Sequence, residues 1–183
     1  PDTAYNGKSI EQINGMKGRK HKAKEEALTV IDIMMEGGAS AIFHGMSEED
    51  IKRIMQYPFN MFASDASIRV LNVGMPHPRG YGTNARVLAK YVREEKVLRL
   101  EEAVWKMSGF PATRLNLQKK GFIRKGMDAD LVLFNPDTVI DGATFDNPFG
   151  EPRGISHVFV GGHLAVKEGA FTGATAGKVL RKK

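Results

Sequence analysis

A protein of 183 residues without a single cysteine forms no disulfide, thiolate metal site or cysteine nucleophile within its own chain. No His-x-His pair occurs either, and no cluster of ligands is dense enough to hold a catalytic metal ion alone. The apolar runs are far too short to cross a bilayer, and we expect no signal peptide. We therefore expect a cytoplasmic protein with no membrane partner. Because Pro1 is not a translation start, we also expect a longer parent.

Composition predicts a folded chain of one ordinary domain or two small ones, since 42% of the residues are hydrophobic and 26% are charged. The net charge is +6, with basic residues concentrated at 17–24 and 178–183. Nucleic-acid interfaces place such patches beside base-stacking aromatic rings, and neither cluster contains one. We interpret the clusters as a solvated helix start and a loose tail, and expect no nucleic-acid partner.

Helical patterning covers residues 1–36 and recurs later in the chain. Ser9 precedes apolar residues spaced three apart, and a second helix over 25–35 ends at two glycines. Further helices are predicted from the capping Ser47 to Met55, over 84–92 and over 99–108. The residues of the second helix that share one apolar stripe are Ala27, Leu28, Ile31, Met34 and Met35, and we interpret the two methionines as core residues.

Two short apolar runs, at 39–44 and 60–64, predict buried strands on either side of the helix that Ser47 caps. Because the connection through this helix is a crossover, parallel pairing of the two strands is favoured. The sequence thus predicts an α/β unit in the first part of the chain.

The pattern changes near residues 115–120. From Gly121 onward, short β-rich runs alternate with turns, and we predict strands at 129–134, 157–160 and 163–166. A surface loop is expected over 141–154. This change predicts two domains, 1–117 and 118–183.

Residues 61–65 read Met-Phe-Ala-Ser-Asp, and residues 77–83 read His-Pro-Arg-Gly-Tyr-Gly-Thr. A strand that ends on a carboxylate and opens into such a loop is typical of the catalytic face of a β/α barrel. A metal-assisted hydrolase would place its general base there. From the pattern alone, Asp65 fits a capping or turn residue equally well.

Other constellations are weaker. A Ser64–His77–Asp65 triad is rejected because the chain has no Gly-x-Ser-x-Gly elbow. His44 ends a predicted strand and is more typical of a structural histidine than of a ligand. Asp128 and Asp130 share one strand face but fit a structural turn.

Four segments resemble one known family, the N-acyl-D-amino-acid deacylases (D-aminoacylases) of the amidohydrolase superfamily: 42–50, 63–65, 77–94 and 125–134. The similarity extends from about Gly7 to Arg181. It implies the C-terminal part of a TIM-like β/α barrel, with a helical insertion at 1–38, followed by part of a small β-sandwich domain. The chain departs from the family at Ala66 and at Asn84-Ala85, which puts substrate choice in doubt.

The resemblance also implies roles for individual residues. Asp65 corresponds to the catalytic carboxylate, which takes a proton from a metal-bound water and returns it to the leaving nitrogen. Arg79 corresponds to the residue that holds the substrate carboxylate, and Ser64, His77 and Tyr81 are further candidates for substrate binding. The family's zinc or similar divalent ion is held by earlier strands, so its ligands are expected upstream of this chain.

We therefore expect the parent to hydrolyse the amide bond of N-acyl-D-amino acids. The chain alone is expected to be inactive, and either to need the missing N-terminal part of the barrel or to self-associate, because half a barrel leaves open strand edges. Two alternatives stay open: another amidohydrolase, such as a hydantoinase-like cyclic amidase, and a non-catalytic fragment or binding domain.

Overall fold

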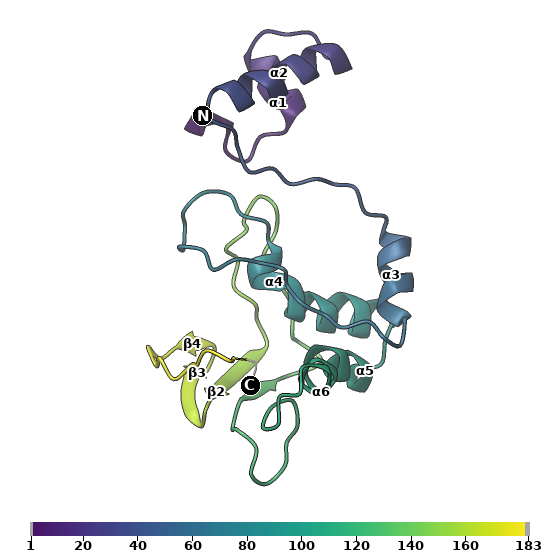
Figure 1. Ribbon diagram of the computed structural model, residues 1–183, viewed down its shortest axis with the longest axis vertical. Helices are drawn as coiled ribbons and strands as arrows, with labels where there is room; N and C mark the ends of the chain where they lie inside the picture. The colour runs from purple at the N-terminus through teal and green to yellow at the C-terminus, as the bar shows by residue number, and fades with distance from the viewer. Residues whose placement is uncertain (1, 182–183) are drawn as a thin grey trace.

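The computed structural model describes residues 2–181, so part of the basic tail, 182–183, lies outside the described residues. The chain forms a helical pair at one end of the molecule, a central group of helices and a small antiparallel sheet (Figure 1). The elements in chain order are η1 (Thr3–Tyr5), α1 (Ile10–Met16), α2 (Ala23–Met35), α3 (Glu48–Gln56), α4 (Arg79–Arg86), η2 (Val87–Glu94), α5 (Leu100–Val104), η3 (Trp105–Gly109), α6 (Phe110–Arg114), β1 (Leu131–Phe134), β2 (Ile155–Val160), β3 (His163–Lys167) and β4 (Ala170–Phe171).

The first helical pair begins as the sequence predicts. Ser9 caps α1 by accepting a hydrogen bond from the Gln12 backbone at 3.1 Å, and the Gln12 side chain accepts one from the Ser9 backbone at 2.9 Å. This reciprocal cap satisfies two amides that the first turn would otherwise leave unpaired. Helix α2 ends at Met35, before the glycines at 37–38.

The helical pair is held together largely by buried polar groups. The fully buried Thr29 hydroxyl donates to Asn14 Oδ1 at 2.8 Å, and the Asn14 amide donates to the Lys20 carbonyl at 2.8 Å. Arg19 donates to the Thr29 hydroxyl at 2.8 Å and forms an ion pair with Asp32 at 2.7 Å. Every polar atom of this cluster that is removed from water therefore has a partner, as burial requires.

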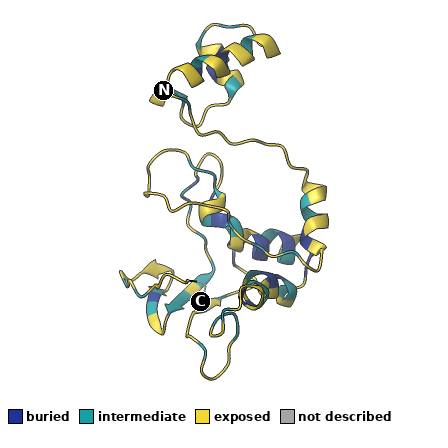
Figure 2. Cartoon of the chain, viewed as in Figure 1, coloured by how far each residue is buried: buried dark blue, intermediate teal, exposed yellow. Residues whose placement is uncertain are grey.

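The apolar stripe of α2 is not its buried face, and the core role predicted for Met34 and Met35 is wrong. The face that packs on α1 carries Thr29 and Ile33, whereas Leu28, Ile31 and Met35 are 41%, 50% and 82% exposed. The polar network between α1 and α2 selects which face is covered, and the apolar face stays uncovered within residues 2–181 (Figure 2).

The basic run at 17–24 is partly neutralised by this packing. Lys17 pairs with Asp32 at 3.1 Å and with Glu36 at 3.3 Å. Hydrogen bonds from Lys17 and Arg19 lower the pKa of Asp32 below its ordinary value. These charges serve the contact between two helices.

The strands expected at 39–44 and 60–64 do not form, and the expected parallel pairing is wrong. Among residues 2–181 the hydrogen-bonded ladders join β1, β2, β3 and β4, all antiparallel, with one further bridge between Ile140 and Arg153. A strand exists only beside a hydrogen-bonding neighbour. The described chain supplies no such neighbour to either apolar run, and the 37–47 segment runs as an extended connection to α3 (Figure 1).

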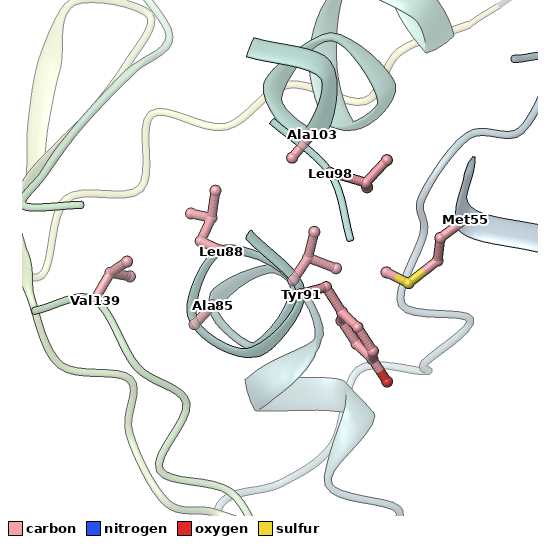
Figure 3. Packing of buried hydrophobic residues seen from close by; sticks show 8 residues of the cluster. Met55, Ala85, Leu88, Tyr91, Leu98, Ala103 and Val139 are labelled. Atoms are coloured by element: carbon pink, nitrogen blue, oxygen red, sulfur yellow. The ribbon is translucent and has the colours of Figure 1, made fainter. Parts of the chain in front are cut away.

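The hydrophobic core lies where η2 packs against α3, α5 and the segment after β1. Figure 3 shows Leu88 and Tyr91 of η2 near the centre, with Met55, Leu98 and Val139 around them. Helix α3 begins after Ser47 and buries Met55, as the sequence predicts. Apolar residues from the helical part and from the β-rich part therefore share one core.

The helices around this core are longer than expected. Helix α4 begins at Arg79, so the predicted loop at 77–83 is helical from its third residue. The helix expected to stop at Ser108 continues through η3 into α6, so Pro111 lies within a continuous helical run. Its missing N–H leaves a carbonyl of the preceding turn without a helical donor, and the Lys106 carbonyl in that turn accepts from the Phe62 N–H at 3.1 Å.

The sheet has the order β1-β2-β3-β4. Its first three strands match the predicted runs, and Gly161-Gly162 form the turn of the β2–β3 hairpin. The strand β4 is too short to show an alternating apolar pattern in the sequence, and it was not predicted. No helix within residues 2–181 is long and apolar enough to span a membrane.

A buried lysine fixes the segment that leads to Asp65. Lys106, only 5% exposed, donates to the Tyr57 carbonyl and, at 3.5 Å, to the Asn60 carbonyl. The Phe62 backbone N–H donates to the Lys106 carbonyl at 3.1 Å. These bonds tie the 57–62 segment to η3 although it has no ladder.

Thr29→Val keeps the shape of the side chain but removes its hydroxyl, leaving Asn14 Oδ1 without its donor. We expect the free energy needed to separate α1 from α2 to fall by about 1–3 kcal/mol, the cost of an unpaired buried polar group. Amide hydrogen exchange in α1 and α2 measures this, with the exposed Thr138→Val as the matched control. Unchanged exchange in the Thr29 variant would contradict the role given to the network.

Lys106→Met keeps the length of the side chain but removes its donors from two carbonyls. We expect a loss of about 1–3 kcal/mol in the free energy of unfolding and faster amide exchange at Phe62. Urea unfolding and hydrogen exchange measure the two effects, and the exposed Lys119→Met serves as the control. Equal stability of the two variants would show that the Lys106 contacts contribute nothing.

Candidate functional site

The five predicted site side chains lie around one pocket. Its volume is about 360 Å³, and Ser64, Asp65, His77, Arg79 and Tyr81 all line it. The remaining lining residues come from 66–69, Pro76 and Gly80. The structure thus brings together residues from an extended segment and from the start of α4.

Asp65 lies at the mouth of the pocket. Its side chain is 88% exposed, and its Oδ2 lies 3.2 Å from a guanidinium nitrogen of Arg79. The residue has a φ of 49°, in the left-handed region that aspartate adopts more readily than most residues but at a cost. Strain of this kind is often retained where a side chain has a chemical task.

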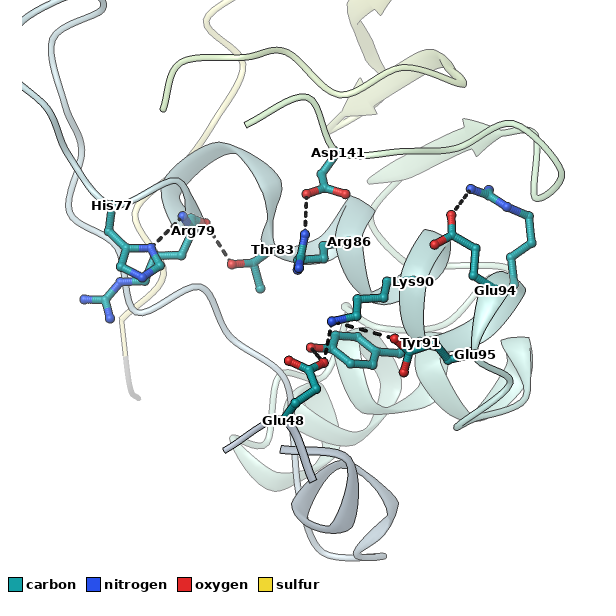
Figure 4. A network of polar contacts seen from close by, with 11 residues as sticks. Glu48, His77, Arg79, Thr83, Arg86, Lys90, Tyr91, Glu94, Glu95 and Asp141 are labelled. Carbon is teal, nitrogen blue, oxygen red and sulfur yellow. Dashed lines mark hydrogen bonds and ion pairs between the residues drawn. The ribbon is translucent and has the colours of Figure 1, made fainter. Parts of the chain in front are cut away.

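Arg79 is the first residue of α4, following Pro78 at the N-cap. Its side chain is 45% exposed, so the guanidinium faces both Asp65 and water. The Arg79 carbonyl accepts from the Thr83 hydroxyl at 2.8 Å (Figure 4). The sequence predicted a loop here, but Arg79 belongs to α4, and the helix sets the direction of its side chain. The Thr83 hydroxyl is bonded to the backbone of the same helix.

His77 is held as a neutral ring. Its Nδ1 accepts a hydrogen bond from the Arg79 backbone N–H at 3.0 Å, so the ring proton resides on Nε2. Burial, the Arg79 charge and His44 together lower the pKa of His77 below its ordinary value. The Nε2–H makes no hydrogen bond within residues 2–181, so it is available as a donor at neutral pH.

Two phenylalanines from the predicted surface loop at 141–154 contact the site. Phe145 packs edge-on against His77, with ring centroids 5.1 Å apart, and against His44, at 4.8 Å. Phe149 packs in the same manner on Tyr81, at 5.6 Å. The sequence analysis missed both phenylalanines, although two aromatic residues within a loop rich in turn residues were a signal of something to pack against.

The loop is also anchored to α4 by charge and by shape. Arg86 pairs with Asp141 at 3.2 Å, and the Asp141 side chain is only 12% exposed (Figure 4). A Cβ atom at Gly82 would lie 3.2 Å from Asp141 Cβ and 3.5 Å from Ala143 Cβ. Gly82 is part of α4, and its missing side chain lets the loop approach the helix.

A charged network on the other side of α4 and η2 was not predicted. Glu48 at the start of α3 accepts from Lys90 and, at 2.8 Å, from the Tyr91 hydroxyl (Figure 4). The hydrogen bonds from Lys90 and Tyr91 lower the pKa of Glu48. This network joins α3 to η2 and does not reach the pocket.

The other candidates are structural. Lys120 pairs with Asp128 at 3.0 Å and also with Asp130, whose second oxygen accepts from the Gly161 backbone at 2.7 Å. The hydrogen bond from Lys120 is the main cause of the lowered pKa of Asp130. This is the structural turn that we weighed against a catalytic carboxylate pair.

No three histidine or carboxylate side chains of the described chain, residues 2–181, converge in a way that could hold a metal ion. The residues present therefore do not fit a metal centre of their own. What they do form is a pocket lined by one carboxylate residue, two arginines (Arg69 and Arg79), a neutral imidazole and three hydroxyl-bearing residues (Ser64, Ser67 and Tyr81).

The chain is similar to known deacylases. It is 37% identical over its full length to a D-aminoacylase of Alcaligenes xylosoxydans xylosoxydans, and it spans 35% of that protein. A crystal structure of D-aminoacylase superposes on it with a TM-score of 0.79 at 37% identity, covering 93% of this chain and 34% of the other.

A third relative is the N-acyl-D-glutamate deacylase of Bordetella bronchiseptica, solved with zinc and a phosphonate mimic of the tetrahedral intermediate. It has a TM-score of 0.74 and 34% identity, covering 86% of this chain and 31% of the other. The model of the amidohydrolase family matches residues 11–166. Because this match covers most of the chain, the chain belongs to the amidohydrolase family.

Proposed function

We propose that this chain is the C-terminal portion of an enzyme that hydrolyses the amide bond of N-acyl-D-amino acids. The observation that carries the proposal is the Asp65–Arg79 pair at 3.2 Å in a pocket that His77, Tyr81 and Ser64 also line. A proton-transferring carboxylate and a carboxylate-binding guanidinium are the two groups that such a substrate needs. The relatives act on substrates of this kind, as their names state.

Asp65 is the proposed general base and acid. Amide hydrolysis requires a group that takes a proton from the attacking water and delivers it to the leaving nitrogen. The Asp65 carboxylate is 88% exposed, so both the water and the nitrogen can reach it.

Arg79 is the proposed anchor of the substrate's α-carboxylate. A guanidinium has five N–H donors, and only one of its nitrogens contacts Asp65 in this structure. The remaining donors can hold a second carboxylate in the paired geometry that arginine favours. The substrate would thus be bound next to Asp65, with its amide bond within reach.

Three neutral groups complete the proposed substrate site. His77 offers Nε2–H as a donor to a substrate oxygen, since its Nδ1 is already bonded to the Arg79 backbone. The Tyr81 and Ser64 hydroxyls line the pocket and make no hydrogen bond within residues 2–181. Free donors of this kind fix the orientation of a ligand with little added charge.

Zinc or a similar divalent ion is the proposed cofactor, bound by polypeptide outside this chain. Two observations support the need for that polypeptide. The relatives are about three times as long, and the 39–44 and 60–64 segments lie without strand neighbours. We propose that 1–117 completes a TIM-like barrel and 118–183 a β-sandwich, and that the isolated chain is inactive or self-associates.

Asp65→Asn in the full-length enzyme is expected to lower kcat by about 10²–10⁴-fold, the usual contribution of a general acid–base group. KM and the zinc content should change little, because the amide keeps the shape of the side chain. Steady-state kinetics with N-acetyl-D-amino acids and metal analysis measure these quantities. The exposed Asp137→Asn is the matched control, and near-normal turnover by the Asp65 variant would remove its proposed role.

Arg79→Ala is expected to raise KM by about 10–100-fold for substrates with a free α-carboxylate, because a charge-assisted hydrogen-bonded pair is lost. For the corresponding substrate amides, which lack that charge, the change in KM should be small. The exposed Arg114→Ala is the control. An equal effect of Arg79→Ala on both kinds of substrate would exclude the carboxylate anchor, and turnover of cyclic amides alone would favour a hydantoinase-like enzyme.

A further inference from the structure

We propose that Phe145 and Phe149 are positioning residues that hold the rings of His77 and Tyr81 at the wall of the pocket. The inference rests on the proposed deacylase function only for what the pocket binds. The placement of the rings stands on the structure of the chain itself.

The two phenylalanines lie behind the pocket wall. His77 and Tyr81 line the pocket, whereas Phe145 and Phe149 contact these two rings without lining it. The planes of Phe145 and His77 meet at 73°, and those of Phe149 and Tyr81 at 77°. Edge-to-face pairs of this kind are favourable and depend on orientation, so they restrict how each ring can turn.

A short turn presents Phe145 to the histidine. The Thr144 N–H donates to the Asn147 carbonyl at 3.0 Å, and the Asn147 N–H donates to the Thr144 hydroxyl at 2.9 Å. Phe145 lies within this closed turn. The Arg86–Asp141 ion pair at 3.2 Å holds the loop on α4 three residues before this turn.

His77 is thereby restrained from two directions. The Arg79 N–H fixes its Nδ1 side at 3.0 Å, and Phe145 lies against its ring. Together they set the direction in which Nε2–H can donate. Phe145 also packs against His44. The loop therefore contacts both histidines and connects three segments that are distant in sequence.

The proposal predicts a change in His77 that a general loss of stability would not produce. Phe145→Ala removes a ring that keeps water from the imidazole, so the pKa of His77 should rise toward its ordinary value of 6.5. NMR titration of the full 183-residue chain measures this, with the His77 signal assigned from a His77→Gln variant. Arg79, whose charge also acts on His77, is unchanged in this comparison, whereas His44 loses its own contact with Phe145.

Two further variants sharpen the test. Phe145→Tyr keeps the ring and should restore the low pKa of His77, whereas Phe171→Ala, on the exposed β4, should leave it unchanged. In the full-length enzyme, Phe145→Ala is expected to lower kcat/KM by about tenfold through misplacement of the donor, with the melting temperature nearly unchanged.

An unchanged pKa of His77 in Phe145→Ala would overturn the proposal, whatever the activity. If that variant does not fold, nuclear Overhauser contacts between the Phe145 and His77 rings of the unaltered chain support the proposal by their presence and overturn it by their absence. The pKa of His77 could rise in Phe145→Ala while the full-length enzyme shows no deacylase activity. That result would leave the positioning role intact and contradict the proposed function instead.

Discussion

The geometry of the site depends on a lysine that is almost out of contact with water. Lys106 is 5% exposed, and its ammonium group is satisfied by the carbonyls of Tyr57 and Asn60. These carbonyls follow α3 directly, where a helix leaves acceptors unpaired and where positive charge is favourable. The chain between them and Asp65 has no strand partner among residues 2–181, so this one contact substitutes for a ladder in fixing where the segment leaves the helical body.

Much of the fold could be predicted because its signals are local. The cap at Ser9, the cap at Ser47 and the β2–β3 hairpin each depend on a few neighbouring residues, and each forms as expected. The errors arose where tertiary contacts decide. The face of α2 is chosen by Thr29 and its polar partners, and an apolar run such as 60–64 becomes a strand only if another strand lies beside it.

The candidate site could be predicted only in part, for a similar reason. Asp65 and Arg79 are close in sequence, and the resemblance to the deacylase family, added to their residue types, placed them together in the hypothesis. The partners of His77 and Tyr81 could not be predicted, because Phe145 and Phe149 come from a loop more than sixty residues away along the chain. Nothing local in 141–154 shows which helix the loop will pack on. The shared core around Leu88 and Val139 and the Arg86–Asp141 ion pair bring the two regions together.

The pocket and the rings packed behind it draw on segments from His44 to Phe149, so they cannot assemble from any short stretch of the chain. Contacts between distant segments form late in folding, since the intervening loop must first close. A molecule bound in the pocket would consequently favour the finished state over every partly folded one. A ligand in this small pocket would thus raise the free energy of unfolding of both the helical body and the 141–154 loop.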